Sequence, residues 1–407
     1  PARVRHFCCR LSLVETIPEG HMYPANMTHT PTKNVWLDLI DEAQTSIEIA
    51  SFYWSLRLNE EYPYNSSIEG EQVFQALYAA GSKRNIHLKI AQNWPTKLYP
   101  NIDTEYLVKK KAAQVRSLNF SKLLGGGVLH TKFWLVDRTH LYVGSANMDW
   151  RSLTQVSVLQ AKSLLFTQVY WSMGAPDARV PDSWPANLTM SKTSVSLNRN
   201  TEAESGRARS SPPAFSPRGR TADDAAIVAV IEGAERFVHI SVMDYAPALE
   251  FTPTFWPKID DAIRRAALEH RVQVKMLISW WQHSAPSEEH FLRSLAALAG
   301  AYPRVSVQIK RYIVPSTPDQ AKIPYARVNH NKYMVTDRAA YIGTSNWSGD
   351  YFVDTAGVGV VLQVGHVLTV LDAAVGWESA TSQRTWNEVM TRGLGRNEQS
   401  DRIRKVS

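Results

Sequence analysis

The sequence predicts an α/β fold in which one domain is made twice, with one composite site where the two copies meet. A motif of His, Lys, Asp, Gly, Ser or Thr, and Asn occurs at residues 128–152 and again at 328–348. Segments with similar strand and helix patterns precede both copies in the same order. Equivalent positions lie about 190 to 200 residues apart, so the repeated unit is a whole strand–helix–strand domain.

Each copy is predicted to begin with a helix end that runs into a buried strand. A helical pattern and a second strand follow, and the second strand alternates apolar and polar residues. The matching segments, in chain order, are 40–54 with 231–245, 70–80 with 258–268, and 85–91 with 271–278.

A β-hairpin is predicted to close each copy and to gather the polar residues of the motif at one end. The Gly that ends its return strand lets the backbone approach a ligand closely. Within each motif one residue separates the His from the Lys, so both side chains point to one face of the strand. The two pairs are His130 with Lys132 and His330 with Lys332.

The two motifs together suit a tetrahedral phosphate. The lysines supply positive charge to its oxygens, and the asparagines and hydroxyls can donate hydrogen bonds. Two histidines can divide the chemistry: a neutral imidazole attacks phosphorus and forms a phosphohistidine, and an imidazolium protonates the leaving oxygen. That acid then acts as a base and activates water or an alcohol. The predicted catalytic residues are His130, Lys132, Asn147, His330, Lys332 and Asn346.

No metal or other cofactor is expected, because no cluster of Asp, Glu and His has metal-ligand spacing. A single His-x-Lys pair would be explained better by a core histidine and a surface lysine. Six positions in fixed order have a chance frequency on the order of 10⁻⁵ per chain. The second copy makes coincidence negligible.

The 407 residues are 44% hydrophobic and carry a net charge of +7, which suits two globular domains with a basic surface. Such a surface favours anionic partners, although a basic protein without one explains the charge alone equally well. No run reaches the roughly 18 apolar residues of a membrane span. The predicted parts are an N-terminal domain at 11–190, a linker or surface loop at 191–222, a C-terminal domain at 223–380 and a polar tail at 381–407.

The paired H-x-K-x4-D and G-[ST]-x-N motifs resemble those of the phospholipase D superfamily. "GSANMDWRSLTQ", "RVNHNKYMVTDRAAYIGTSNWS" and "VETIPEG" are most similar to one branch, the endolysosomal five-prime exonucleases of single strands. The resemblance implies two similar phospholipase D-like α/β domains with one composite active site and a phosphohistidine mechanism. It also implies a type II membrane anchor upstream of Pro1, transit through the ER and Golgi, and a site of action in the endolysosomal lumen.

The resemblance assigns the first motif's His as nucleophile and the second motif's as acid, with the reverse left open. The residues expected to brace the motifs are Asp137, Asp337, Ser145 and Ser345. Four aromatic residues are candidates for base stacking, although any one of them is more often a core residue. These are Tyr53, Trp54, Trp281 and Trp347. The asparagines expected to be glycosylated are Asn26, Asn65, Asn119 and Asn187.

Three features depart from that branch. Relatives continue after "DWRSLTQV" with Lys-Glu-Leu-Gly, and that Glu is expected to orient the first histidine, whereas residues 157–171 here are short and hold no acid. Cys8 and Cys9 have no candidate partners for a disulfide. "SWWQHS" holds Trp where relatives tend to have Cys. These departures leave a weakened or non-catalytic binding protein as an alternative.

The leading hypothesis is a metal-independent 5'-to-3' exonuclease that acts on single-stranded DNA or RNA. A second hypothesis keeps the chemistry but takes an acidic phospholipid, by hydrolysis or headgroup exchange, because a phosphohistidine is indifferent to what leaves. A homodimer is a further partner state that the sequence leaves open.

Overall fold

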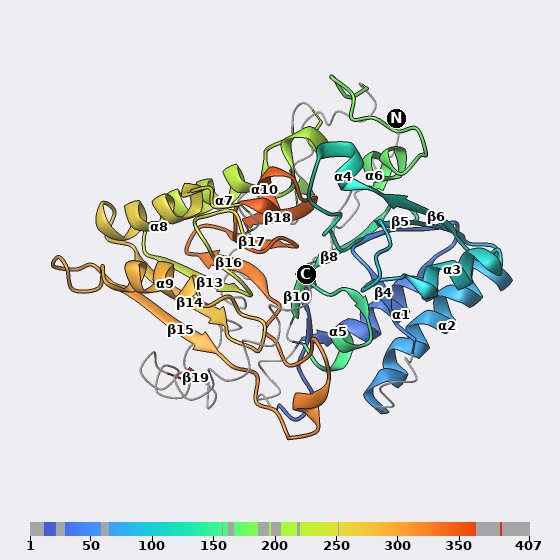
Figure 1. Cartoon of the computed structure of the whole chain (residues 1–407), viewed down its shortest axis with the longest axis horizontal. Coiled ribbons are helices and arrows are strands. Elements are labelled where there is room, and N and C mark those ends of the chain that lie inside the picture. The colour runs from blue at the N-terminus through green and yellow to red at the C-terminus, as the bar shows by residue number, and fades with distance from the viewer. Residues whose placement is uncertain are drawn as a thin grey trace, which may run out of the picture.

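The computed structural model consists of two halves that lie side by side, the first coloured blue to green and the second yellow to red in Figure 1. Both halves combine a mixed sheet with helices on its outside. The residues that the structure describes are 12–21, 29–57, 65–156, 158–161, 167–185, 195–196, 205–217, 220–250, 252–363 and 383–384.

The elements of the first half are β1 (Val14–Thr16), β2 (Thr30–Pro31), α1 (Thr32–Glu42), β3 (Ser46–Ser51), β4 (Trp54–Ser55), α2 (Ile68–Lys83), β5 (His87–Asn93), α3 (Ile102–Lys109), β6 (Gln114–Leu118), α4 (Phe120–Leu124), β7 (Phe133–Val136), β8 (His140–Gly144), β9 (Met148–Asp149), α5 (Arg151–Thr154), β10 (Val158–Ala161) and α6 (Thr167–Met173). Those of the second half are β11 (Val195–Ser196), β12 (Ser205–Ser211), α7 (Asp223–Glu232), β13 (Phe237–Val242), α8 (Lys258–Leu268), β14 (Gln273–Ser279), α9 (Glu288–Ala296), β15 (Val307–Tyr312), β16 (Lys332–Thr336), β17 (Ala340–Gly343), α10 (Asp350–Val353), β18 (Gly357–Gln363) and β19 (Gln383–Arg384).

The two sheets repeat one strand order. The first contains β10-β8-β7-β3-β5-β6, and the second contains β18-β17-β16-β13-β14-β15 in the equivalent places. In each sheet the last three strands pair in parallel, while the hairpin strands pair antiparallel. The predicted α/β duplication is therefore confirmed.

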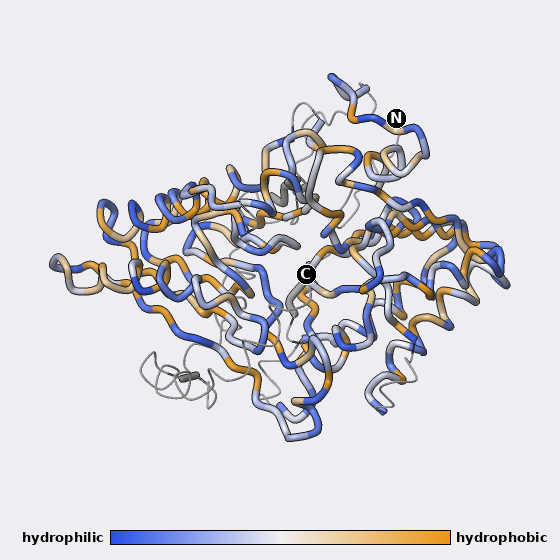
Figure 2. The backbone as a smooth tube through the Cα atoms, in the orientation of Figure 1, coloured by the Kyte–Doolittle hydropathy of each residue, from blue (hydrophilic) through white to orange (hydrophobic). Residues whose placement is uncertain are grey.

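Local patterns explain why these segments form these elements. Helix α8 buries Ile259, Ala262, Ile263 and Ala266, which fall at helical spacing on one face. Strands β3 and β13 are buried over most of their length, and their apolar residues alternate with small or polar ones that are buried as well. Figure 2 shows apolar and polar residues alternating along the outer helices, as one-sided burial requires.

The hairpins of the two halves share one apolar core. Phe133 and Val143 of β7 and β8 belong to the same buried cluster as Tyr333, Ile342 and Val358 of the second half. Burying side chains of this size stabilises a fold by roughly 1.5–3 kcal/mol each. This shared core fixes the ends of the two hairpins, and so the two motifs, next to each other.

The structure differs from the linker expected at 191–222. Strand β12 lies within that segment and pairs with β18 along seven residues, from Ser205 opposite Gln363 to Ser211 opposite Gly357. It takes the place that β1 takes beside β10 in the first half. The repeated unit thus begins with a strand that pairs beside β10 or β18, and a period of about 190 to 200 residues, applied to β1, leads to β12.

Most of the predicted tail at 381–407 lies outside the described residues. Its described part is β19, which pairs with β15. The helices in the described part of the chain include none long and apolar enough to cross a bilayer.

Candidate active site

Each motif histidine is hydrogen-bonded by the opposite half of the molecule. His130 Nδ1 lies 3.0 Å from the backbone oxygen of Thr344, and His330 Nδ1 lies 2.9 Å from that of Ser145. The backbone around the first histidine is also paired across the halves, because the amide of His130 donates to the oxygen of Ala356 at 2.9 Å. The two motifs therefore form one site.

These bonds decide the tautomer of both rings. A carbonyl oxygen can only accept a hydrogen bond, so Nδ1 of each histidine carries the hydrogen. In a neutral imidazole the other nitrogen then holds a lone pair. Nε2 of His130 and Nε2 of His330 are thus the atoms available to attack phosphorus or to carry the transferred proton.

Aromatic rings hold His130 on two sides. Its ring lies 5.2 Å from that of Phe52, which follows β3, and 5.0 Å from that of Tyr351 in the second half.

Strand β10 is present after the first motif but has four residues, against seven in β18. The orientation that a carboxylate was expected to provide comes here from the Thr344 oxygen and these two rings.

Two buried lysines stand beside the histidines. Lys132 Nζ donates to the backbone oxygen of His130, and Lys332 Nζ donates to that of His330 at 2.9 Å. Burial, followed by the charge of Lys332, holds the pKa of Lys132 well below its usual range. Burial lowers the pKa of Lys332 to about 7 against the opposing effect of Asp244. Two such ammonium groups favour an anion between them.

The same environment keeps the histidines neutral. Burial, followed by the charges of the two lysines, holds the pKa of His130 and the pKa of His330 well below the ordinary value of 6.5. A phosphodiester anion bound there would offset the lysine charges and make protonation of one imidazole easier.

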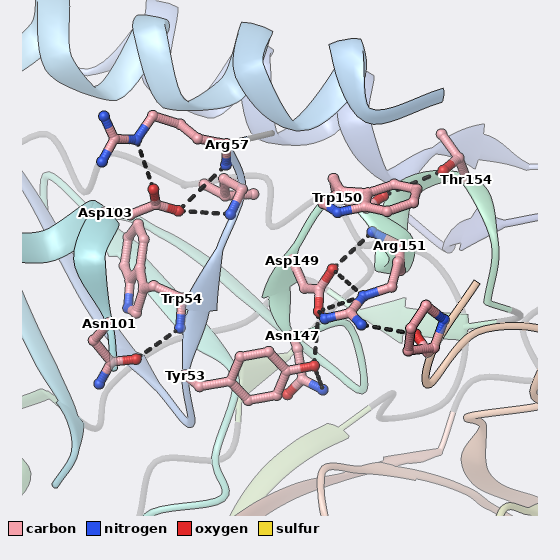
Figure 3. Close-up of polar contacts among 12 residues, drawn as sticks. Tyr53, Trp54, Arg57, Asn101, Asp103, Asn147, Asp149, Trp150, Arg151 and Thr154 are labelled. Carbon is pink, nitrogen blue, oxygen red and sulfur yellow. Dashed lines mark hydrogen bonds and ion pairs between the residues drawn. The ribbon is translucent and has the colours of Figure 1, made fainter. Parts of the chain in front are cut away.

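The two motif asparagines have different neighbours. Asn147 Nδ2 lies 3.5 Å from the hydroxyl of Tyr53, and that hydroxyl donates to Asp149 at 2.8 Å, as Figure 3 shows. Asn346 Nδ2 donates to the carboxylate of Asp244 at 2.6 Å and to a tyrosine hydroxyl at 3.1 Å. The amide of Asn147 is therefore held less tightly.

The predicted bracing aspartates lie at the hairpin turns, away from the histidines. Asp137 accepts hydrogen bonds from the amides of Gln44, Thr45 and Ser46, and Asp337 accepts them from residues 235–237. Although burial opposes it, these bonds hold the pKa of Asp137 at about 2. Each carboxylate ties its hairpin to the chain that enters β3 or β13.

The other two bracing candidates lie in the loops that follow the hairpins. Ser145 is fully buried and contributes its backbone oxygen to His330, as described above. Ser345 is fully buried against Gly357, where even a Cβ would collide with the Ser345 hydroxyl. Both residues support the motif through close packing of the backbone.

Two of the four stacking candidates are core residues. Trp54 is 3% exposed and Trp347 is 1% exposed, so neither can present a face to a base. Each comes shortly after a buried strand and forms a backbone β-bridge, Trp54 with Met148 and Trp347 with Tyr245. Tyr53 is also buried, and its hydroxyl is bonded as described above. Trp281 is half-buried at the boundary between the halves.

The sequence pointed to Phe52 only as one of several aromatic residues near the motifs, and it did not single out Tyr351 or Asp244 as site residues. Asp244 lies two residues after β13, where Tyr53 lies two residues after β3. Aligning 46–54 with 237–245 would have pointed to Asp244. Burial, followed by the charge of Glu288, raises the pKa of Asp244 to about 7.

The "VETIPEG" segment contacts both halves of the molecule. Gln155 donates to the carboxylate of Glu19 at 2.9 Å, and Arg327 donates to the backbone oxygen of Glu19 at 3.0 Å. Arg327 also donates to the Gln155 side chain at 3.2 Å. This network links the segments just before and after the two motifs.

Two predicted glycosylation sites lie in the described part of the chain. Asn65 is exposed, and Asn119 caps α4 by accepting from the amide of Lys122 at 3.0 Å. Asn26, Asn187 and the two cysteines lie outside the described residues. Among the residues described, no group of three or more His, Cys, Asp or Glu could hold a metal ion.

Comparisons with known proteins agree with this geometry. The family model described as "PLD3/4, PLD-like domain" matches residues 24–317. The chain is 45% identical to the 5'-3' exonuclease PLD3 of Xenopus laevis over 93% of this chain and 80% of that protein. It is 43% identical to the 5'-3' exonuclease PLD4 of Mus musculus over 87% of this chain and 73% of that protein. A phosphatidylserine synthase of Haemophilus influenzae shares the fold, with a TM-score of 0.57 at 12% identity, over 86% of this chain and 84% of that one.

Proposed function

Because this chain belongs to the PLD3/4 family of phospholipase D-like proteins, we propose that it is a 5'-to-3' exonuclease of single-stranded DNA or RNA. The observation that carries the proposal is the pair of histidines bonded crosswise through Nδ1. This arrangement presents two Nε2 atoms to one substrate between two buried lysines. It supports a phosphodiesterase in which each half supplies one histidine.

In the first step Nε2 of His130 attacks phosphorus and forms a P–N bond. The P–O bond to the leaving oxygen breaks, and that oxygen takes the proton from Nε2 of His330. Lys132 and Lys332 stabilise the charge that develops on the phosphoryl oxygens. The product of this step is a phosphohistidine and a shortened strand.

In the second step the neutral His330 accepts a proton from water as the water oxygen attacks phosphorus. The P–N bond breaks, and His130 returns to its neutral form. The site is restored with the transferred proton again on Nε2 of His330, so the cycle consumes one water molecule for each bond that is cleaved. The Thr344 and Ser145 oxygens keep both rings oriented through both steps.

We also propose that the protein acts in an acidic compartment, the endolysosomal lumen, after synthesis as a type II membrane precursor. The lowered pKa of His330 supports this, because an imidazole that resists protonation needs an acidic medium to serve as the acid. The exposed sequon at Asn65 is compatible with transit through a glycosylating compartment.

The test uses an oligonucleotide labelled at its three-prime end, at about pH 5.5, one unit below the free histidine value, with EDTA present. His130→Ala and His330→Ala run beside the wild type. We expect stepwise shortening from the five-prime end in the wild type and none in either variant.

Internal cleavage would contradict the exonuclease assignment, and cleavage that survives either substitution would contradict the two-histidine mechanism. A folded wild type that binds the oligonucleotide without cleaving it would instead support the binding-protein alternative. Circular dichroism of each variant checks that a loss of activity is not a loss of fold.

A further inference from the structure

A row of aromatic rings leads away from His130 on the first half of the molecule. The half-buried ring of Phe52 contacts His130 and also lies 5.5 Å from Lys132 Nζ. The ring of Tyr99 lies 5.4 Å from that of Phe52 and stacks on Tyr53 at 4.3 Å with an interplanar angle of 22°. Tyr99 is half-buried and belongs to the loop between β5 and α3, so part of its surface faces solvent.

The second half carries a matching row. The ring of Tyr325 is 40% exposed and stacks on His283 at 4.8 Å with an interplanar angle of 16°. The ring of Trp281 lies edge-on to His283 at 4.6 Å. Tyr325 adopts a φ of 54°, a left-handed conformation that is unfavourable for a bulky side chain. Such strain persists where the surrounding structure holds it in place, which is common at functional sites.

The two rows are connected across the boundary between the halves. Burial, followed by the proximity of Tyr325, raises the pKa of Tyr99, so the two phenols are electrostatic neighbours. Arg151 links the two rows without a covalent bond: its guanidinium binds Asp149, which also accepts from the Tyr53 hydroxyl, and donates at 2.8 Å to the backbone oxygen of Pro324, the residue before Tyr325. The relative position of the two rows is therefore set by a buried ion pair.

We propose that Phe52, Tyr99, Tyr325 and His283 form an aromatic clamp that stacks on an unpaired base next to the phosphate held by the histidines. The inference rests on the proposed function and adds the part of the substrate that the site recognises. Every base has a π-face, so such a clamp binds single strands with little sequence preference. A base in a duplex is paired and stacked, so it would have to leave its partner and its neighbour before the clamp could hold it.

Replacement of Tyr325 tests the clamp with little risk to folding. Tyr325→Asn removes the ring but keeps a residue that tolerates the left-handed backbone. Tyr325→Phe keeps the ring. Tyr302, which is 60% exposed in the loop between α9 and β15, gives the matched control Tyr302→Ala. Substrates are a single-stranded oligonucleotide, the same strand with an abasic first or second nucleotide, and bis(p-nitrophenyl) phosphate.

We expect Tyr325→Asn to raise KM for the oligonucleotide about tenfold, the size that loss of one stacked base gives. Hydrolysis of bis(p-nitrophenyl) phosphate should not change, and Tyr325→Phe and Tyr302→Ala should match the wild type. The wild type and Tyr325→Asn should have equal KM on one of the two abasic strands, because no base remains there to stack.

An equal loss on the intact strand, both abasic strands and the small substrate would show a structural role and overturn the clamp. An unchanged KM for the intact strand in Tyr325→Asn, with an active wild type, would overturn it as well. A wild type that hydrolyses neither the oligonucleotide nor bis(p-nitrophenyl) phosphate would instead refute the proposed function, and the clamp with it.

Discussion

The two halves place the same hairpin in the same sheet but surround it with different chemistry. In the first half, Tyr53 lies beside Asn147, and the rings of Phe52 and Tyr99 line the approach. At the equivalent place in the second half, Asp244 holds Asn346. The sulfur of Met243, which corresponds to Phe52, lies 3.6 Å from Lys332 Nζ.

This difference teaches that duplication fixed the backbone while the two copies took separate tasks. The first half offers flat apolar surface and a loosely held amide, which suit contact with the substrate. The second half offers a buried carboxylate whose pKa is raised to about 7 beside a lysine whose pKa is lowered to about 7. We therefore expect the carboxylate of Asp244 to make stability depend on pH, whereas Tyr53 at the equivalent place in the first half should not.

The largest expected effect separates the two histidines. Either His130→Ala or His330→Ala should lower the rate on an oligonucleotide by about 10³-fold or more. The first substitution removes the attack on phosphorus, and the second removes protonation of the leaving oxygen. On bis(p-nitrophenyl) phosphate the leaving group needs no proton. If His130 is the nucleophile, His330→Ala should release about one p-nitrophenol per protein in a burst and then stall, while His130→Ala should show no burst. The reverse pattern, measured by stopped-flow absorbance, would move the nucleophile to the second half.

The next effect compares the lysines. Lys132→Met and Lys332→Met should each lower kcat by about 10²-fold, because each removes charge that stabilises the phosphoryl oxygens in the transition state. Methionine is unbranched, only one atom shorter than lysine and apolar, so it suits a buried place. Steady-state kinetics that show a change in KM alone would mean that the lysine only binds the ground state.

A smaller effect concerns pH and stability. The pKa of Asp244 is raised to about 7 by burial first, while the ordinary value is 3.8. Between about pH 4 and pH 7 the folded protein therefore keeps a proton that the unfolded chain has released, so this group makes the free energy of unfolding fall as pH rises. Asp244→Asn should remove that part of the slope. Urea unfolding at pH 5 and pH 7 measures it, and a difference between variant and wild type that is the same at both pH values would contradict it.

The smallest expected effect is that of Tyr53→Phe, the change in the first half that corresponds to Asp244→Asn in the second. Tyr53→Phe removes one hydroxyl that bonds Asp149, which the backbone amide and the guanidinium of Arg151 continue to hold. The free energy of unfolding should fall by about 0.5–1.5 kcal/mol, with no change in its pH dependence between pH 5 and pH 7. A pH-dependent effect as large as that of Asp244→Asn would break the distinction between the halves.

Much of the site was predictable because its signals are local. His and Lys one residue apart in an alternating strand point to one face wherever the strand lies, so His130, Lys132, His330 and Lys332 were assignable from spacing. The bounds of α8 coincide with the predicted 258–268, since helical periodicity records its own buried face.

The sequence by itself determined the duplication, the paired motifs and the residues able to handle a phosphate. The tertiary structure decided how the halves combine: Thr344 and Ser145 orient histidines about 200 positions away, Trp54 and Trp347 are buried, and β12 joins a sheet. The physical reason is that contact between distant segments produces no periodic pattern of apolar residues in the sequence of either segment. Burial and cross-half hydrogen bonds depend on which surfaces meet, and that is settled only when the two hairpins share one core.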